Sequence, residues 1–244
     1  MSTLVMPYPA HDRLAADGSV RLRLLGAFRL EVDGEVVHVS LGAQRLLALL
    51  GLRGWMSRPR VAGTLWPETS QTQALTNLRH VLWRLQCSVP GHLLVGAAGT
   101  ELALAASVRC DTARLEDAAR RLWSGEREVV ATEELRDAVS ELLPDWDDDW
   151  VVGDRERLRQ LHLHALETYA EWLLAARRFG PALEVALTAL SADLLRESAH
   201  RTVIKVHSAE GNVSEARRAL DRCRTILHAD LGVAPSAETL ALVP

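Results

Sequence analysis

The chain of 244 residues is poor in cysteine, in lysine and in long apolar runs. Its cysteines, Cys87, Cys110 and Cys223, are too few and too scattered for a disulfide framework or a zinc site, so we expect reduced thiols. No run of about 18 uncharged apolar residues is available to span a bilayer. The first 17 residues lack the cationic patch and apolar stretch of a secretory signal. These absences predict a cytoplasmic protein without a membrane partner.

Motifs for catalysis and cofactor binding are also missing. The sequence has no Ser or Cys nucleophile motif, and no glycine-rich phosphate loop with a lysine, because Lys205 is its only lysine. His162 and His164 fall two residues apart in a predicted helix and would point to different sides of it, which argues against a metal site. We therefore predict no enzyme, no cofactor and no metal.

Charge is divided unevenly along the chain. The net charge is −4, from 28 basic and 32 acidic residues. Residues 1–106 hold 10 Arg and 7 acids, a balance of +3, whereas residues 107–244 hold 18 basic and 25 acidic residues, a balance of −7. Nearly all the basic residues are arginine, whose planar guanidinium group suits phosphates and guanine edges. The base composition of a genome explains the preference for arginine over lysine equally well. The division predicts a mildly basic first half and an acidic second half.

The first half predicts a small sheet, three helices and a hairpin, in that order. Residues 1–19 have no apolar period and are expected to form a flexible arm. Alternation over residues 21–25, 28–32 and 35–39, with Asp33-Gly34 as a turn, predicts three or four antiparallel strands. Helical periodicity follows over residues 43–53, 58–66 and 72–86. Two apolar segments that flank residues 96–100 then predict a second hairpin with its tip at these residues. Residues 20–106 therefore fit an α+β winged helix-turn-helix domain.

The second half, residues 107–244, predicts an all-α domain. Helical patterns cover residues 112–123, 132–143, 154–177, 181–190, 196–210, 214–231 and 237–242. The segment around Phe179 resembles the segment around Val213, 34 residues further on, which is the tetratricopeptide period. Small residues at Ala182 and Ala216 would let paired helices approach closely. The acidic stretch 145–149 is expected to be a loop that Trp146 and Trp150 anchor.

The third helix, residues 72–86, has a polar face that lacks acidic residues. Apolar side chains occupy one sector of the helical wheel, and the opposite sector and its flanks hold Gln73, Thr76, Asn77, Arg79, His80, Trp83 and Arg84. Asn and Gln can pair with adenine, Arg with guanine or phosphate, and Thr or Trp can contact a thymine methyl or a sugar edge. An ordinary solvated helix face has a similar composition. The interpretation as a recognition helix therefore depends on the flanking elements and on the charge division.

Several strings of residues, in order and at family-like spacing, strengthen this interpretation. In the first half they are Arg23-Leu24-Leu25-Gly26, Gln44-Arg45-Leu46-Leu47-Ala48-Leu49-Leu50, Leu65-Trp66-Pro67-Glu68, Asn77-Leu78-Arg79 and Leu82-Trp83-Arg84-Leu85. In the second half they include Cys110-Asp111, Leu143-Pro144-Asp145-Trp146, Leu195-Arg196-Glu197-Ser198 and Leu231-Gly232-Val233-Ala234-Pro235. From about Arg21 to Leu242 the chain resembles the Streptomyces antibiotic regulatory protein family. In that family an OmpR-type winged helix-turn-helix is joined to a bacterial transcriptional activation domain.

The resemblance implies a transcriptional activator that binds tandem direct repeats in double-stranded DNA near a promoter. It also implies contacts with RNA polymerase and its sigma factor, and control of secondary metabolism such as antibiotic biosynthesis. By position, Gln73, Thr76, Asn77, His80 and Arg84 would face the major groove, and Trp83 is a further candidate for DNA contact on the same face. Arg79, Arg45 and the wing near Thr100 would hold phosphates, although this wing lacks the basic residues that such wings often have. Direct repeats allow a homodimer on DNA without requiring a symmetric dimer in solution.

One alternative from another functional class remains open. The chain could be a helical-repeat scaffold that binds a protein or a small ligand, without sequence-specific DNA binding. Such a scaffold predicts binding that is insensitive to DNA sequence and to salt. The activator instead predicts specific duplex binding that weakens steeply as salt rises, because counterions are released from the DNA.

Overall fold

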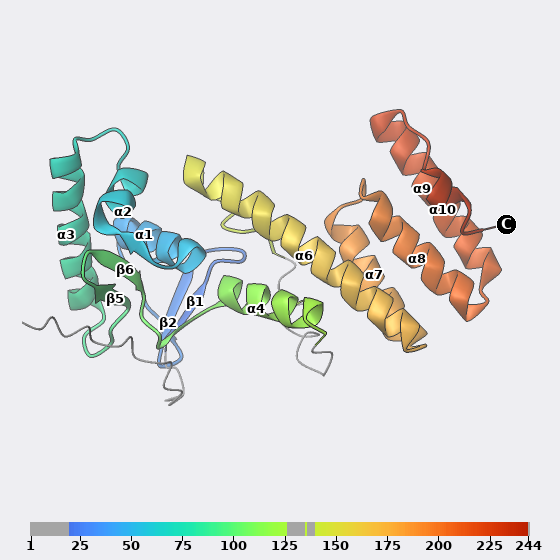
Figure 1. Cartoon of the computed structure of the whole chain (residues 1–244). Coiled ribbons are helices and arrows are strands. Elements are labelled where there is room, and N and C mark those ends of the chain that lie inside the picture. The colour runs from blue at the N-terminus through green and yellow to red at the C-terminus, as the bar shows by residue number, and fades with distance from the viewer. Residues whose placement is uncertain (1–19, 126–134, 136–139, 244) are drawn as a thin grey trace, which may run out of the picture. The chain divides into compact units, whose positions relative to one another are not determined.

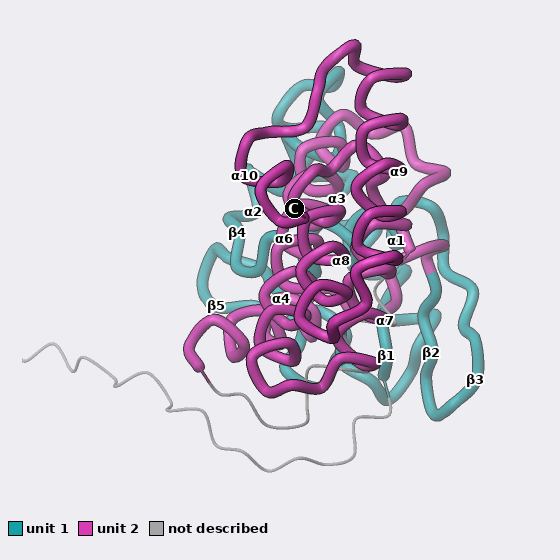
Figure 2. Tube along the Cα trace, turned by 90° about the vertical axis from the view of Figure 1, so that its right-hand side faces the viewer, with its two compact units in different colours: residues 1–22, 29–109 teal, residues 23–28, 110–244 magenta. Residues whose placement is uncertain are grey.

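The computed structural model describes residues 20–125, 135 and 140–243 (Figure 1). Internal packing divides the chain into two compact units, shown in different colours in Figure 2. The described part of the first unit comprises residues 20–22 and 29–109. The second unit comprises residues 23–28 and the chain from residue 110 onward. The predicted arm, residues 1–19, and most of the predicted helix 132–143 lie outside the described residues.

Short strands near the start of the chain form the first sheet. Its order is β3-β2-β1-β7, with β1 at Val20–Arg23, β2 at Arg29–Val32, β3 at Glu35–Val36 and β7 at Val108–Cys110. Strands β2 and β3 are antiparallel, and Val32 lies opposite Glu35. Asp33 and Gly34 between them have φ angles of 53° and 86°, as a two-residue hairpin turn with two left-handed residues requires. The hairpin predicted from Asp33-Gly34 is therefore confirmed, whereas β7 carried no recognisable strand signal.

Three predicted helices of the first unit are confirmed within one or two residues at each end. They are α1 (Leu41–Arg53), α2 (Arg58–Leu65) and α3 (Gln71–Ser88). Helix α3 begins after Ser70, whose hydroxyl accepts a hydrogen bond from the Gln73 backbone N–H, as an N-cap does. Helix α1 is apolar on nearly all sides because it packs against α2, α3 and the strand β6. These contacts fix α3 on the core through Ala74, Leu78 and Leu85.

The second sheet contains the predicted wing. Strands β5 (Val95–Ala98) and β6 (Glu101–Leu104) pair antiparallel, and β4 (Met56–Ser57) lies on the other side of β6. The turn consists of Gly99-Thr100 alone, so the broader loop expected over residues 96–100 is wrong, since Ala98 still pairs with Glu101. Gly99 has a φ of 57°, a conformation that an L residue adopts only at a cost. The first unit is thus a sheet, three helices and a hairpin among its described residues, as a winged helix-turn-helix requires.

The second unit consists mainly of stacked helices. They are α4 (Asp111–Trp123), α6 (Asp149–Ala175), α7 (Phe179–Ala192), α8 (Glu197–Glu210), α9 (Val213–Leu231) and the short α10 (Ala237–Leu240). Each of α6 to α9 packs against the next, as Figure 1 shows. Ala182 and Ala216, the small residues of the predicted repeat, are both buried. The predicted repeat positions Phe179 and Val213 are the first residues of α7 and α9. An ion pair between Lys205 Nζ of α8 and Glu171 Oε1 of α6, at 3.2 Å, adds a contact across the stack.

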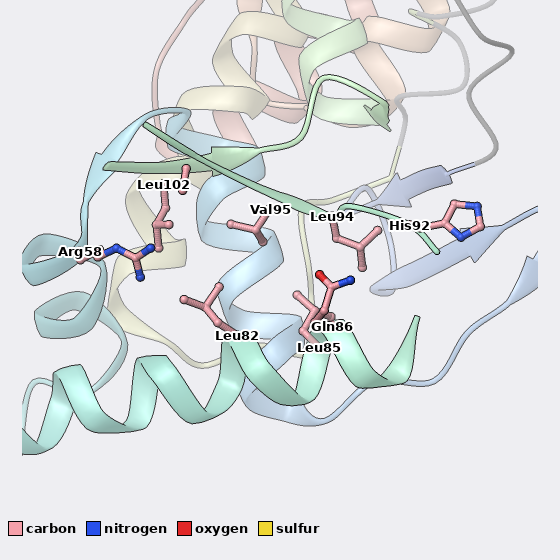
Figure 3. A pocket seen from close by; sticks show the side chains of 9 residues that line it. Arg58, Leu82, Leu85, Gln86, His92, Leu94, Val95 and Leu102 are labelled. Atoms are coloured by element: carbon pink, nitrogen blue, oxygen red, sulfur yellow. The ribbon is translucent and has the colours of Figure 1, made fainter. Parts of the chain in front are cut away.

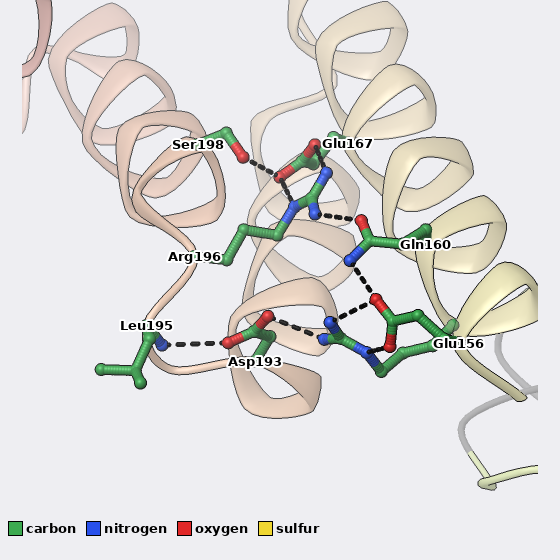
Figure 4. A network of polar contacts seen from close by, with 8 residues as sticks. Glu156, Gln160, Glu167, Asp193, Leu195, Arg196 and Ser198 are labelled. Atoms are coloured by element: carbon green, nitrogen blue, oxygen red, sulfur yellow. Dashed lines mark hydrogen bonds and ion pairs between the residues drawn. The ribbon is translucent and has the colours of Figure 1, made fainter. Parts of the chain in front are cut away.

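A network of polar side chains connects α6 with the junction between α7 and α8 (Figure 4). Arg159 donates to Glu156 at 2.9 Å and to Asp193 at 2.8 Å. Arg196 donates to Glu167 at 2.8 Å, and both side chains of this pair are largely buried. Gln160, Leu195 and Ser198 complete the network. Because its members come from α6, from the junction between α7 and α8 and from α8, the network ties these segments together.

The chain before α6 differs from the prediction. Leu135 is helical, but Ser140 to Leu143 are not, so the predicted helix 132–143 is wrong at its C-terminal end. Leu142 instead forms β-bridges with Leu25 and Gly26, and Leu143 has a φ of 41°. Pro144 contributes to this difference, because the α conformation is disfavoured for Leu143, the residue that precedes it.

An arginine and an aromatic cluster hold this segment in place. The Arg155 guanidinium donates to the carbonyl oxygens of Leu142, Leu143 and Trp146, at 2.9, 2.7 and 3.0 Å. Trp146 stacks on Phe28 and meets the edge of Trp150, with ring centroids 6.2 and 6.3 Å apart. The anchoring role predicted for Trp146 and Trp150 is confirmed. Helix α6 begins at Asp149, five residues before the predicted start.

The carboxylate of Asp111 fastens residues 23–28 to the start of α4. It accepts hydrogen bonds from the backbone N–H of Leu24, at 3.0 and 2.9 Å, and from that of Leu25, at 3.0 Å. It also accepts one from the N–H of Thr112, at 2.8 Å, in the first turn of α4. Burial raises the pKa of Asp111, and the N–H donors oppose that shift. This single side chain therefore connects segments 86 and 87 residues apart within the second unit.

Candidate nucleic-acid interface

Helix α3 presents one continuous polar face. Gln73, Arg79, His80, Trp83 and Arg84 are exposed, and Thr76 and Asn77 are half-buried. Trp83 is 67% exposed, which is unusual for a tryptophan that only supports a core. No acidic residue lies on this helix. The structure thus brings together the seven α3 residues that the sequence analysis selected.

The N-terminal part of this face is organised by its own hydrogen bonds. The Gln73 side-chain N–H donates to Asn77 Oδ1 at 3.1 Å, one helical turn away. Arg79 folds back along the helix and donates to the Leu75 carbonyl and to the Thr76 hydroxyl, each at 3.3 Å. The Gln73 side-chain oxygen and the Asn77 amide N–H groups have no hydrogen bond among the described residues. The pair therefore offers an acceptor and donors whose relative positions are set before a ligand arrives.

The C-terminal part of the face is uncommitted. Among the described residues, no hydrogen bond or ion pair engages the side chains of His80 and Arg84. Trp83 lies beside them and is open to solvent. A long cationic side chain without an intramolecular partner can reach an external phosphate or base edge without first breaking a contact. This part of α3 is thus available for binding.

The two other predicted contacts lie on different elements. Arg45 is half-buried on α1, away from the exposed face of α3. Thr100 is exposed in the β5–β6 turn, and its carbonyl accepts a hydrogen bond from the Arg58 N–H at 2.9 Å. This bond ties the turn to the start of α2, where Arg60 is exposed. The sequence analysis missed Arg58 and Arg60, although Pro59 between them is a recognisable sign of a helix start.

Three reactive side chains outside α3, those of His162, Cys110 and Cys223, are buried. His162 is buried, and its Nε2 lies 2.7 Å from the Leu135 carbonyl oxygen. Burial lowers the pKa of His162, so its ring is neutral at pH 7. Burial also raises the pKa of the Cys110 and Cys223 thiols to about 11, which keeps them protonated. Within the described ranges, no group of three or more His, Cys, Asp or Glu is placed to hold a metal ion.

Membrane insertion finds no support in the helices that the structure describes. None of them combines the length and the apolar composition needed to cross a bilayer.

Comparisons with known proteins identify the second half of the chain. A family model described as "Bacterial transcriptional activator domain" matches residues 95–243, more than half of the sequence. Among solved structures, the chain is similar to EmbR of Mycobacterium tuberculosis in complex with a low-affinity phosphopeptide, with a TM-score of 0.70 and 20% identity. The similarity covers 92% of this chain and 64% of the EmbR chain, so this chain spans less than two thirds of that protein. A search of the curated proteins gave no match.

At 20% identity, the likeness to EmbR establishes the fold. It confirms the predicted winged helix-turn-helix followed by a tetratricopeptide-like helical domain. The family match confirms the resemblance on which the sequence analysis relied. The chain belongs to the bacterial transcriptional activator domain family.

Proposed function

We propose that this chain is a sequence-specific DNA-binding transcriptional activator. In this proposal, residues 20–106 bind tandem direct repeats in double-stranded DNA near a promoter. Residues 107–244 contact RNA polymerase and its sigma factor, and the protein acts in the cytoplasm on genes of secondary metabolism. The observation that carries the proposal is the exposed, acid-free face of α3 within a winged helix-turn-helix.

The organised amide pair is assigned to base recognition. With Asn77 Oδ1 engaged by Gln73, the Asn77 N–H groups and the Gln73 side-chain oxygen are left for a ligand. A donor and an acceptor of this kind complement the N7 acceptor and N6 donor that adenine presents in the major groove. Thr76 flanks this pair. Adenine is therefore the base that we assign to the N-terminal part of α3.

The uncommitted side chains have a different role in this proposal. Arg84 and His80 are assigned to guanine edges, and Trp83 to a thymine methyl or a sugar edge. Arg79 is tied back along its own helix, so it is assigned to a phosphate. Arg45 and Thr100 are assigned to phosphates as well, and Arg60 is added to them because it is exposed beside the wing turn. Phosphate contacts position the protein, whereas the contacts made by α3 specify the sequence.

The weak positive charge of the first half sets the binding mode. A balance of +3 over residues 1–106, from 10 Arg and 7 acids, supplies little non-specific attraction. We expect one protomer to bind weakly and to need a neighbour on the adjacent repeat. The acidic second half, with a balance of −7 from 18 basic and 25 acidic residues, is assigned to protein partners. Removal of residues 107–244 should abolish activation, and a truncated protein that still activates would refute this role.

A mobility-shift titration on the protein's own upstream promoter tests the proposal. The competitor is a shuffled duplex of the same composition, and binding is measured at about 50 and about 200 mM salt. Three arginine–phosphate contacts per protomer predict a loss of affinity of roughly 40-fold between these salt concentrations. Absence of a specific shift at either salt would refute the activator and favour the helical-repeat scaffold.

Single substitutions separate base contacts from phosphate contacts. Asn77→Ala and Arg84→Ala should weaken specific binding by about 1–3 kcal/mol each and leave binding to shuffled DNA unchanged. Arg79→Ala should weaken binding to both duplexes equally. Gln86→Ala is the control, because Gln86 is exposed on α3 and is not among the residues assigned to DNA. Equal losses for Asn77→Ala and Gln86→Ala would contradict the assignment.

A further inference from the structure

A cavity of about 210 Å³ lies behind α3, within the first unit (Figure 3). Its apolar walls include Leu82 and Leu85 of α3 and Val95 and Leu102 of the β5–β6 hairpin. Leu82 follows Gln73 by nine residues, which places it half a turn around the helix from the polar face. The cavity is therefore separate from the surface assigned to DNA, and it lies between α3 and the hairpin.

The size of the cavity limits its occupant. An apolar protein cavity of about 150 Å³ accommodates benzene. At about 210 Å³, this cavity has room for one ring and a small substituent. Solvent reaches it, because Ala97 at its edge is exposed and Val95 is half-buried. A small molecule can enter without unfolding the unit.

The charge of the lining limits the occupant further. Figure 3 shows the Arg58 side chain extending toward the cavity from the start of α2. Arg58 is half-buried, and its guanidinium has no hydrogen bond or ion pair among the described residues. His92, at the other end, is already paired with Asp33, with Nε2 and Oδ2 3.4 Å apart. No acidic residue is among the described residues that line the cavity.

A guanidinium without a partner in the protein is available to pair with an anionic ligand. A carboxylate fits it, because its two oxygens match the planar fork of arginine. The apolar walls require that the rest of the ligand be hydrocarbon. An uncharged ligand would leave Arg58 unpaired, and a dianion would place a second charge among leucines.

We propose that this cavity is a binding site for a small monocarboxylate with a single ring or a short branched hydrocarbon body. The carboxylate pairs with the Arg58 guanidinium, and the hydrocarbon body lies among Leu82, Leu85, Val95 and Leu102. The site goes beyond the proposed function, and it lies between two elements that this function assigns to DNA contact.

An NMR titration of the full chain, labelled at Leu and Val methyl groups, tests the site without DNA. Benzoate is the probe, and benzamide is its neutral counterpart of the same shape. Benzoate should shift the methyl signals of Leu82, Leu85, Val95 and Leu102. Benzamide should bind at least tenfold more weakly, since a hydrogen bond between charged groups contributes more than about 1.4 kcal/mol.

Two arginine variants complete the test. Arg58→Gln should weaken benzoate at least tenfold and leave benzamide unchanged. Arg60→Gln is the matched control, because Arg60 lies two residues further along α2 and does not line the cavity. The methyl spectrum itself reports whether each variant is folded. Absence of shifts in the cavity, or equal effects of the two substitutions, would overturn the proposal whether or not the protein binds DNA.

Discussion

Replacement of Asp111 by alanine should destabilise the second unit by about 3 kcal/mol. The carboxylate is the acceptor for the backbone N–H groups of Leu24 and Leu25. Leu24 is fully buried, so water cannot replace the lost acceptor, whereas Leu25 is half-buried. A buried donor left without a partner costs about 1–3 kcal/mol. With the Leu24 donor near the middle of that range and the Leu25 donor near its lower end, the sum is about 3 kcal/mol.

Differential scanning calorimetry of the full chain measures this loss. For a chain of this length, about 3 kcal/mol corresponds to a decrease of roughly 6–12 °C in melting temperature. Asp117→Ala is the control, because Asp117 lies on the same helix and forms exposed ion pairs with Arg120 and Arg121. Such pairs contribute about 0–1 kcal/mol. A decrease for Asp111→Ala no larger than for Asp117→Ala would refute the reasoning.

Three further substitutions test other parts of the account. Burial raises the pKa of Glu167, but hydrogen bonds from Arg196 and a serine hydroxyl lower it more, so the net shift is downward. Its stabilisation is therefore present above the unfolded pKa of about 4.3 and is lost as pH falls through the lower folded pKa. The melting temperatures of the wild type and Glu167→Gln should converge as pH falls from about 7 to about 3. A difference in melting temperature that stays constant over this range in calorimetry would contradict a lowered pKa for Glu167. Gly99→Ala should destabilise the first unit by about 1–2 kcal/mol, because φ is 57° at this position and an alanine adopts that angle only at a cost. An unchanged midpoint of urea unfolding would contradict the left-handed conformation of Gly99. Arg155→Ala should reduce the near-ultraviolet circular dichroism of the tryptophans, because the Trp146 carbonyl loses its donor, and an unaltered spectrum would count against the anchoring role.

Local signals predicted the elements of the first unit well. Apolar spacing over residues 72–86 located α3 within one or two residues of its bounds, and the first hairpin followed from Asp33-Gly34. Strand β4 at Met56–Ser57 escaped prediction because two residues are too short to show alternation. Strand β7 was missed for a similar reason, since its three residues have no turn signal of their own.

Long-range contacts could not be predicted in this way. The bond from Leu24 to Asp111 joins positions 87 residues apart, and nothing in either local pattern indicates the other. The helix expected at 132–143 followed apolar spacing and overlooked the effect of Pro144 on Leu143. Periodicity in the sequence thus located the helices and strands. Which distant segments contact one another could be learned only from the structure.

For the candidate interface, helical periodicity predicted which side chains share a face. It could not predict that Gln73 bonds to Asn77, or that Arg79 folds back on its own helix, because both depend on rotamers. Arg60 was missed because the bond that ties the start of α2 to the wing turn, from the Arg58 N–H to the Thr100 carbonyl, is not visible in the local pattern. The division of the face into an organised part and an uncommitted part is therefore a result of the structure.

Selection of bound duplexes from a random pool, with the full chain, tests the central claim most directly. The account predicts an enriched motif that occurs twice in the same orientation, with centres about 10 base pairs apart. Selection with Asn77→Ala should retain the motif and lose the preference at a single adenine position. A pool without an enriched motif, or the same motif and adenine preference with Asn77→Ala, would contradict the claim that α3 of this protein reads DNA sequence.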